Sequence, residues 1–241
     1  MEIMQKIAKK AADLYGEKSP TIAFLGDSVT QGCFELYTKT NGDMETVFDR
    51  SSTYAQYLSD ILAQLFPNVP VNIVNAGISG DRAPSGADRL ERDVLAHRPD
   101  LTVVCYGLND STWGMHSLPL YTAGLERIFK ALQQAGSECI FMTPNMMNPT
   151  ISCHVHNTPF ETVAKTTMDV QNSGTLTNYL EAGKQVAAAC GVRVCDVYAK
   201  WQLLAANGVD VSELLANHIN HPTRYMNRLF AYSLMETLLQ P

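Results

Sequence analysis

A serine at the end of an apolar run is the residue best placed for chemistry in this chain. Residues 22–25 are apolar and are typical of a buried strand, and they lead directly into the turn residues Asp27 and Ser28. Ligands of parallel α/β sheets bind outside the carboxyl ends of the strands. The Ser28 hydroxyl would therefore face a ligand and could act as a nucleophile. The alternative is that Asp27 or Ser28 only caps the following helix, as such residues often do.

Three further polar blocks lie at the ends of predicted elements. They are Asn75–Asp81, Gly107–Asp110 and His221–Pro222. Each block alone is a weak indication, because glycine and asparagine after a strand are ordinary turn residues. A histidine, however, can take the proton of a serine hydroxyl and return it to a leaving group. Fixed N–H donors can stabilise the negative oxygen of the intermediate. The four blocks together therefore predict nucleophilic catalysis.

In this order the blocks resemble those of the SGNH hydrolases, also called the GDSL esterase/lipase family, over most of the chain. The resemblance implies that Ser28 is the nucleophile and that His221 is the general base. It also implies a flavodoxin-like three-layer α/β/α sandwich and a reaction that needs no cofactor and no metal. The oxyanion donors that it implies are the backbone N–H of Ser28, Gly80 and the side chain of Asn109.

The last block departs from the family pattern, in which an aspartate three residues before the histidine orients it. Here that position holds His218, which cannot serve as a carboxylate. Three explanations remain open. We favour a Ser28–His221 dyad in which a backbone carbonyl orients the imidazole. In the second, a substitute acid, Asp210 or Glu213, reaches His221 from the preceding segment. In the third, the protein is catalytically impaired.

The elements that must position these blocks alternate between strand and helix from end to end, which predicts βαβ units around a central parallel sheet of about five strands. The predicted strands are Thr21–Leu25, Val71–Asn75, Leu101–Tyr106, Glu138–Met142 and Val192–Val197. The predicted helical segments are Glu2–Tyr15, Thr53–Leu65, Ser85–Ala96, Leu120–Ala135, Leu176–Cys190, a short turn over Glu213–Asn217, and Arg224–Leu239.

The whole chain, residues 1–241, is predicted to form one domain, because no Pro/Gly/Ser-rich linker divides it. Two insertions, Cys33–Ser52 and Pro144–Ser173, are longer than the usual α/β loop. Both follow elements on the face where the site is expected. We favour a role in covering the substrate or in contacting another copy of the chain, since loops on that face often carry function.

Composition narrows the class of partner. The formal net charge is −6 and no basic run is present, so a nucleic-acid partner is not expected. No apolar segment is long enough to span a membrane, and the charged N-terminus does not read as a signal peptide. We expect a cytoplasmic protein whose six cysteines are free thiols.

Two other kinds of site receive less support. Gly77 and Gly80 could line a phosphate-binding loop, but the GxGxxG and GxxxxGK[ST] motifs are absent. A metal site is conceivable because His-x-His and His-x-x-His pairs can ligate zinc, although we expect none here. The histidines concerned are His154, His156, His218 and His221.

The expected activity is hydrolysis of a short-chain acyl ester, acetyl in particular, of a carbohydrate or other small polar alcohol, through an acyl-enzyme on Ser28. The Pro144–Ser173 insertion is polar and offers no Leu-rich lid for a fatty chain. Trp113 beside the third block could stack on a sugar or an acyl chain, or simply pack in the core. The alternatives are a lysophospholipase or thioesterase, and a binding module of the same fold that has lost activity. The sequence alone determines neither the acyl chain nor the alcohol.

Overall fold

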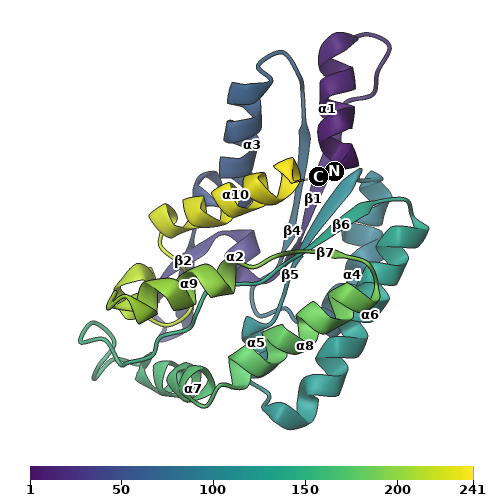
Figure 1. The fold of residues 1–241 in the computed structure, drawn as a ribbon. Coiled ribbons are helices and arrows are strands. Elements are labelled where there is room, and N and C mark those ends of the chain that lie inside the picture. Colours follow the sequence, from purple (N-terminus) through teal and green to yellow (C-terminus); the bar gives the residue numbers. More distant parts are fainter. Residues whose placement is uncertain (241) are drawn as a thin grey trace.

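The computed structural model describes residues 1–240, and its centre is a parallel sheet of five strands (Figure 1). The strands lie in the order β4-β1-β5-β6-β7. Every pairing along the sheet is parallel. The bounds of these strands are β1 Thr21–Gly26, β4 Asn72–Gly77, β5 Leu101–Cys105, β6 Glu138–Met142 and β7 Arg193–Cys195.

Helices cover both faces of this sheet (Figure 1). Successive strand residues point to opposite faces, so that Ile22 and Phe24 belong to one apolar core and Ala23 and Leu25 to the other. The first core is covered by α1 Glu2–Ala12, α3 Tyr54–Leu65, α9 Val197–Ala206 and α10 Arg224–Leu239. The second is covered by α4 Ala83–Asp93, α6 Leu118–Gln134 and α8 Thr175–Ala189. The predicted three-layer α/β/α sandwich is confirmed.

The strand order is that of a flavodoxin-like sheet. Counted only among the strands of the sheet, it is 2-1-3-4-5, and the chain changes direction of travel between β1 and β5. Ligands of such sheets bind at this switch point, outside the carboxyl ends of the strands. The residues that follow β1 and β5 include Ser28 and Asn109, which places two of the predicted blocks there.

Shorter elements follow the strand ends. They are α2 Ser28–Gln31, α5 Leu108–Ser111 and α7 Glu161–Asn172, with an antiparallel hairpin of β2 Cys33–Thr38 and β3 Met44–Phe48. Single 3-10 turns lie at η1 Arg50–Ser52, η2 Leu95–His97, η3 Met115–Ser117 and η4 Val211–Leu214. The segment 33–52 therefore contains the hairpin and η1, and the segment 144–173 ends in α7.

All five predicted strands are present, with ends shifted by at most two residues. Four of the α-helices in residues 1–240 lie outside the predicted helical segments: the four-residue α2 and α5, and the longer α7 and α9. Helix α9 is apolar on most of its surface, so its sequence lacks the periodicity of an amphipathic helix. Helix α7 is rich in threonine and valine, which favour strands and loops over helices. Its placement depends on tertiary packing, such as the buried contact of Gln171 with Tyr198.

Candidate active site

Ser28 and His221 are brought together although 193 residues separate them in the chain. Oγ of Ser28 lies 3.0 Å from Nε2 of His221. Ser28 is the first residue of α2, and the Asp27 carboxylate caps this helix by accepting a 3.0 Å hydrogen bond from the Val29 N–H. Asp27 therefore caps this helix, while the Ser28 hydroxyl faces a histidine. Only 4% of the Ser28 surface and 6% of that of His221 are exposed.

A backbone carbonyl orients the imidazole of His221. Nδ1 lies 3.0 Å from the carbonyl oxygen of Phe34, in the first strand of the hairpin. A carbonyl can only accept, so Nδ1 carries the proton and Nε2 offers its lone pair to the Ser28 hydroxyl. Burial lowers the pKa of His221 to about 4, and the Phe34 hydrogen bond opposes this shift only in part.

The hairpin that supplies this carbonyl is held against the start of α10, the helix that follows His221. The Arg224 guanidinium lies 4.3 Å from the centre of the Phe34 ring. It also forms ion pairs with Glu35, on the same strand, and with Asp49, after β3. The insertion at 33–52 therefore positions a polar atom of the site through the Phe34 backbone.

Neither candidate orienting acid contacts His221. The Asp210 carboxylate accepts a 3.0 Å hydrogen bond from the Ser212 N–H and so caps η4. Glu213 accepts a 3.2 Å hydrogen bond from the Ser152 hydroxyl. Within residues 1–240, no carboxylate forms a hydrogen bond or ion pair with His221. This arrangement is the one that the dyad explanation requires.

His218 occupies the position at which the family pattern has aspartate, and its ring contacts Ser212, Glu213 and His154. Its φ of 55° is left-handed. Its Nδ1–H donates to the carbonyl of Ser212 over 3.2 Å. The side-chain oxygen of Asn217 accepts from the backbone N–H groups of Ile219, Asn220 and His221 at 2.9–3.0 Å, which fixes the turn before the base.

Gly80 and Asn109, the two predicted oxyanion residues besides Ser28, lie on adjoining turns. The Asp81 N–H donates to the Ile78 carbonyl over 3.1 Å, with Gly80 in the third position at φ 78°. That is the conformation for which glycine is favoured in a type II turn. Asn109 Nδ2 donates to the Asp81 carbonyl over 3.0 Å and makes a long 3.4 Å contact with the Asp27 carboxylate. Asn109 thus connects the first, second and third blocks.

A buried ionic network beneath these turns was not predicted. Arg89 of α4 pairs with Asp81 at 2.6 Å. It also donates to the carbonyls of Gly26 and Ala76 at the ends of β1 and β4. The Tyr106 hydroxyl donates to the same Asp81 carboxylate over 2.7 Å. The Asp–Arg–x₆–Arg spacing around Asp81 carried the only sequence indication, and a helical arginine ordinarily lies on the surface.

Two more buried carboxylates accompany this network. Asp110 accepts backbone hydrogen bonds from Ala83 and Gly107 at 2.9 and 3.1 Å. Burial raises the pKa of Asp110 to about 7, and burial raises the pKa of Asp27 to about 7 as well. The side of the site formed by Gly80 and Asn109, the predicted oxyanion side, is therefore built on carboxyl groups, and burial raises the pKa of two of them to about 7.

The fold and the strand-end blocks define the class. The family model for GDSL-like lipases and acylhydrolases matches residues 24–229. The chain belongs to this family of ester-hydrolysing enzymes. None of the helices in residues 1–240 combines the length and apolar character that crossing a bilayer requires.

Similar proteins point in the same direction. An acetylxylan esterase from Geobacillus stearothermophilus is 29% identical over 139 residues, and the match covers 54% of this chain and 60% of that relative. The crystal structure of Axe2, an acetylxylan esterase from the same organism, superimposes with a TM-score of 0.66 at 20% identity, over 92% of this chain and 95% of that one. The structure of BT4096, a gut microbial diltiazem-metabolizing enzyme, superimposes with a TM-score of 0.68 at 19% identity, and the match covers 91% of this chain and 47% of that one. Both structural likenesses show a shared fold.

The Axe2 structures also sharpen the departure at His218. Catalytic mutants of Axe2 have a serine, a histidine or an aspartate replaced by alanine, and that aspartate lies three residues before that histidine. At this spacing from His221, the present chain has His218.

Proposed function

We propose that this chain is a serine ester hydrolase that removes short acyl groups, acetyl in particular, from a carbohydrate or another small polar alcohol. The observation that carries the proposal is the 3.0 Å contact between Ser28 Oγ and His221 Nε2. Membership of the acylhydrolase family supports ester hydrolysis. The acetylxylan esterase relative supports acetyl as the acyl group.

In the first half of the reaction, His221 Nε2 takes the Ser28 proton while Oγ attacks the ester carbonyl carbon. The carbonyl π electrons move to oxygen, and a tetrahedral oxyanion forms. When the intermediate collapses, the C–O bond to the alcohol breaks and His221 returns the proton to the departing oxygen. Ser28 then carries the acyl group.

In the second half, water replaces the alcohol. His221 takes a proton from the water as its oxygen attacks the acyl-enzyme, and it then gives this proton to Ser28 Oγ as the carboxylic acid leaves. The imidazolium that forms in each half is stabilised by the Phe34 carbonyl dipole instead of by a carboxylate.

Three N–H donors would receive the oxyanion. The N–H of Ser28 has no partner within α2, because it is the first residue of that helix. Gly80 adds a backbone N–H from the turn beside α2. Asn109 adds a side-chain amide, which would exchange its long contact with Asp27 for the shorter and stronger bond to the oxyanion.

An exposed aromatic side chain next to Asn109 supports a sugar as the alcohol. Trp113 is 47% exposed, and the Arg82 guanidinium lies 3.7 Å from the centre of its ring. Arg82 also donates to the backbone carbonyl of Asn109 over 3.0 Å. An indole surface held beside the oxyanion residues is suited to stacking on a sugar ring.

A panel of p-nitrophenyl esters from acetate to decanoate, with acetylated xylo-oligosaccharides alongside, tests the proposal. We expect kcat/KM to be highest for acetyl esters. Ser28→Ala should lower turnover by at least about 10³, and it should abolish labelling by a fluorophosphonate probe. Trp113→Ala should raise KM for the acetylated sugars and leave that for p-nitrophenyl acetate nearly unchanged.

Other outcomes identify the alternatives. A preference for decanoate over acetate would replace the acetylesterase proposal by a lysophospholipase or thioesterase type of acyl hydrolase. Absence of both turnover and labelling in the natural sequence would identify a binding module. Retention of most activity in Ser28→Ala would remove Ser28 as the nucleophile.

A further inference from the structure

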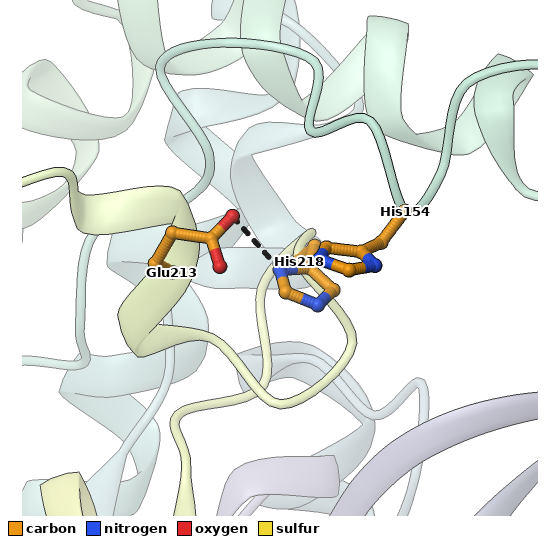
Figure 2. Close-up of side chains that lie close together, drawn as sticks. All are labelled: His154, Glu213 and His218. Atoms are coloured by element: carbon orange, nitrogen blue, oxygen red, sulfur yellow. Dashed lines mark ion pairs between the residues drawn. The ribbon is translucent and has the colours of Figure 1, made fainter.

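A cluster of two histidines and a glutamate lies outside the Ser28–His221 pair. His154 comes from the segment before α7, Glu213 from η4, and His218 from the turn that precedes His221. One potential ligand atom from each side chain lies within 4.8 Å of the other two. Figure 2 shows His154 and Glu213 approaching His218 from two separate segments.

The side chains of this cluster are arranged closely. The two imidazole rings are stacked, with centres 4.7 Å apart and planes 19° apart. His218 Nδ1 lies 3.6 Å from a carboxylate oxygen of Glu213, the contact drawn as a dashed line in Figure 2. Imidazole nitrogen and carboxylate oxygen are the donors that Zn²⁺ and similar divalent transition metals prefer.

The backbone beneath the cluster is fixed, so the ligands need not be assembled from mobile chains. Val155 and Ile219, the neighbours of His154 and His218, are both buried in one small apolar cluster. The Asn148 N–H donates to the Ile219 carbonyl over 2.9 Å and joins the same two segments. The Ser152 hydroxyl donates to Glu213 and orients its carboxylate. Hydrogen bonds of this kind to ligating groups strengthen metal sites.

We propose that His154, Glu213 and His218 bind a divalent transition-metal ion of the zinc type, with water in the remaining position. His218 would ligate through Nδ1 as the neutral tautomer that carries its proton on Nε2, so the ion would replace the hydrogen bond from Nδ1 to Ser212. Ligand atoms around tetrahedral Zn²⁺ are roughly 3–3.5 Å apart, given bonds of about 2.0–2.2 Å. Rotations that move these atoms by about an ångström would therefore close the site. His154 and Glu213 are exposed, which leaves room for such rotations.

The other two histidines of the pairs seen in the sequence do not belong to this site. The His156 ring lies 3.4 Å from Glu161. Both nitrogens of His221 are engaged, by Ser28 and by Phe34. The metal would clamp the segment 152–156 to the turn 217–221, which also carries His221. The ion takes no part in the ester hydrolysis proposed above, and its binding can be measured whether or not that activity exists.

Titration of the chelator-stripped full chain with ZnCl₂, followed by calorimetry, tests the proposal. We expect one Zn²⁺ per chain with micromolar affinity and much weaker binding of Mg²⁺, which prefers oxygen ligands. Saturating Zn²⁺ should raise Tm by roughly 5 °C. His154→Ala and His218→Ala should each weaken binding by at least about tenfold, and Glu213→Gln by about tenfold. His156→Ala and Cys153→Ser are the matched controls and should leave it unchanged.

Two results would overturn the proposal. One is the absence of saturable Zn²⁺ binding. The other is binding that survives His154→Ala but is lost in His156→Ala, Cys153→Ser or His221→Ala, since the ion would then lie elsewhere. His154 is exposed, so its alanine variant should fold, and circular dichroism checks this. The test therefore does not depend on the fold of the His218 variant.

Discussion

The two sides of the candidate active site are built from different chemistry. On the base side, His221 is held by a backbone carbonyl and by an asparagine-anchored turn, and no carboxylate contacts it within residues 1–240. On the oxyanion side, three buried carboxyl groups and one buried arginine support the turns. They are Asp27, Asp81, Asp110 and Arg89. The family pattern places a carboxyl group behind the histidine, whereas in this chain the buried carboxyl groups lie under the proposed oxyanion donors.

This difference has an electrostatic consequence. A buried histidine without an ionised partner is neutral near pH 7, so it is ready to accept a proton but holds it weakly. Buried carboxylates near an oxyanion would repel it. Pairing of Asp81 with Arg89 offsets one of these charges, and the raised pKa of Asp27 and of Asp110 keeps part of the population neutral near pH 7. Near pH 7, therefore, His221 is uncharged before the reaction, and the buried carboxyl groups near the proposed oxyanion carry less net negative charge than their number suggests.

Removal of the base should have the largest effect. His221→Ala should lower kcat/KM for acetyl esters by at least about 10³, because within residues 1–240 no other side chain forms a hydrogen bond with the Ser28 hydroxyl and could take its proton. The variant should remain folded by circular dichroism. Residual activity above one tenth would mean that the base side works through a group other than His221, and the comparison of the two sides would fail.

On the oxyanion side, Arg89→Met tests whether the buried ion pair holds the turns. Losing the cation leaves Asp81 charged and unpaired in the interior, which should lower the free energy of unfolding by about 3–5 kcal/mol in urea titration. Arg127→Met is the control, since Arg127 pairs with Asp88 on the exposed surface. Its cost should be below about 1 kcal/mol. Equal losses of unfolding free energy in the two variants would show that the buried ion pair stabilises the fold no more than a surface ion pair does.

Asn109→Ala tests the donor that joins the blocks. Turnover should fall by about 10²–10³ with little change in KM, because the amide binds the oxyanion more strongly than the ground-state carbonyl. Steady-state kinetics on an acetyl ester separates the two parameters. A change confined to KM would make Asn109 a substrate-binding residue and would leave the oxyanion side without its side-chain donor.

Some parts of the candidate site could be predicted from the sequence and others could not. Ser28, Gly80, Asn109 and His221 could be proposed because each stands in a short turn after an apolar run or before a helix, and such turns are local features. The five strands could be predicted for the same reason. The carbonyl of Phe34 could not, because every residue carries that group and only the hairpin brings this one to Nδ1.

The charged groups were also beyond sequence reasoning. Apart from its spacing from Asp81, a weak indication, the sequence around Arg89 does not distinguish it from a surface arginine; its burial follows from the contacts with the ends of β1 and β4. Helix α9 was missed for a local reason, because its largely apolar surface gives no amphipathic period and the strand predicted at Val192–Val197 overlaps its first residue. For Arg89 and the Phe34 carbonyl, by contrast, the deciding contact joins segments far apart in the chain.

The dependence of kcat/KM on pH compares the two sides in one experiment. With its pKa near 4, His221 should be about 97% neutral at pH 5.5, whereas an ordinary histidine would be about 10% neutral. We therefore expect an acid limb near pH 4 and not near 6.5. Asp110 also has a pKa near 7, so only a limb near 6.5 that persists in both Asp27→Asn and Asp110→Asn would contradict the lowered pKa of His221. Asp27→Asn removes any limb near pH 7 that comes from Asp27 itself.

The same pKa values make opposite contributions to folding. The pKa of His221 is lower in the folded than in the unfolded chain, so the unfolded chain binds more protons between these two pKa values. The contribution of His221 to the free energy of unfolding is therefore lost as pH falls from about 6.5 towards 4. For Asp27 and Asp110 the folded pKa is the higher one. Their contribution is present at low pH and is lost as pH rises from about 4 towards 7. The free energy of unfolding of the Asp27→Asn variant should therefore depend less on pH between about 4 and 7 than that of the unmodified protein.

The smallest expected effect is that of His218→Asp, which restores the family spacing on the base side. We expect less than about a twofold change in kcat/KM measured with a chelator present, of the size expected for a group that does not touch the base. The backbone at 218 is left-handed, which aspartate tolerates. The side chain there faces the Ser212 carbonyl and Glu213, however, and the Phe34 carbonyl already occupies Nδ1 of His221. Asp210→Asn, which removes a helix-capping carboxylate away from His221, is the control.

Larger changes in kcat/KM in two variants would show that a carboxylate can act on His221. A rate increase of tenfold or more in His218→Asp would mean that the new side chain displaces the Phe34 carbonyl and stabilises the imidazolium. The base side would then be a triad site that lacks only its acid. A fall on the order of 10³–10⁴ in Glu213→Gln, the scale of losing the orienting acid of a protease triad, would instead show that Glu213 reaches His221 during turnover. If neither change occurs, hydrolysis by this chain depends on a neutral carbonyl behind the base, and the buried carboxyl groups act only through the oxyanion turns.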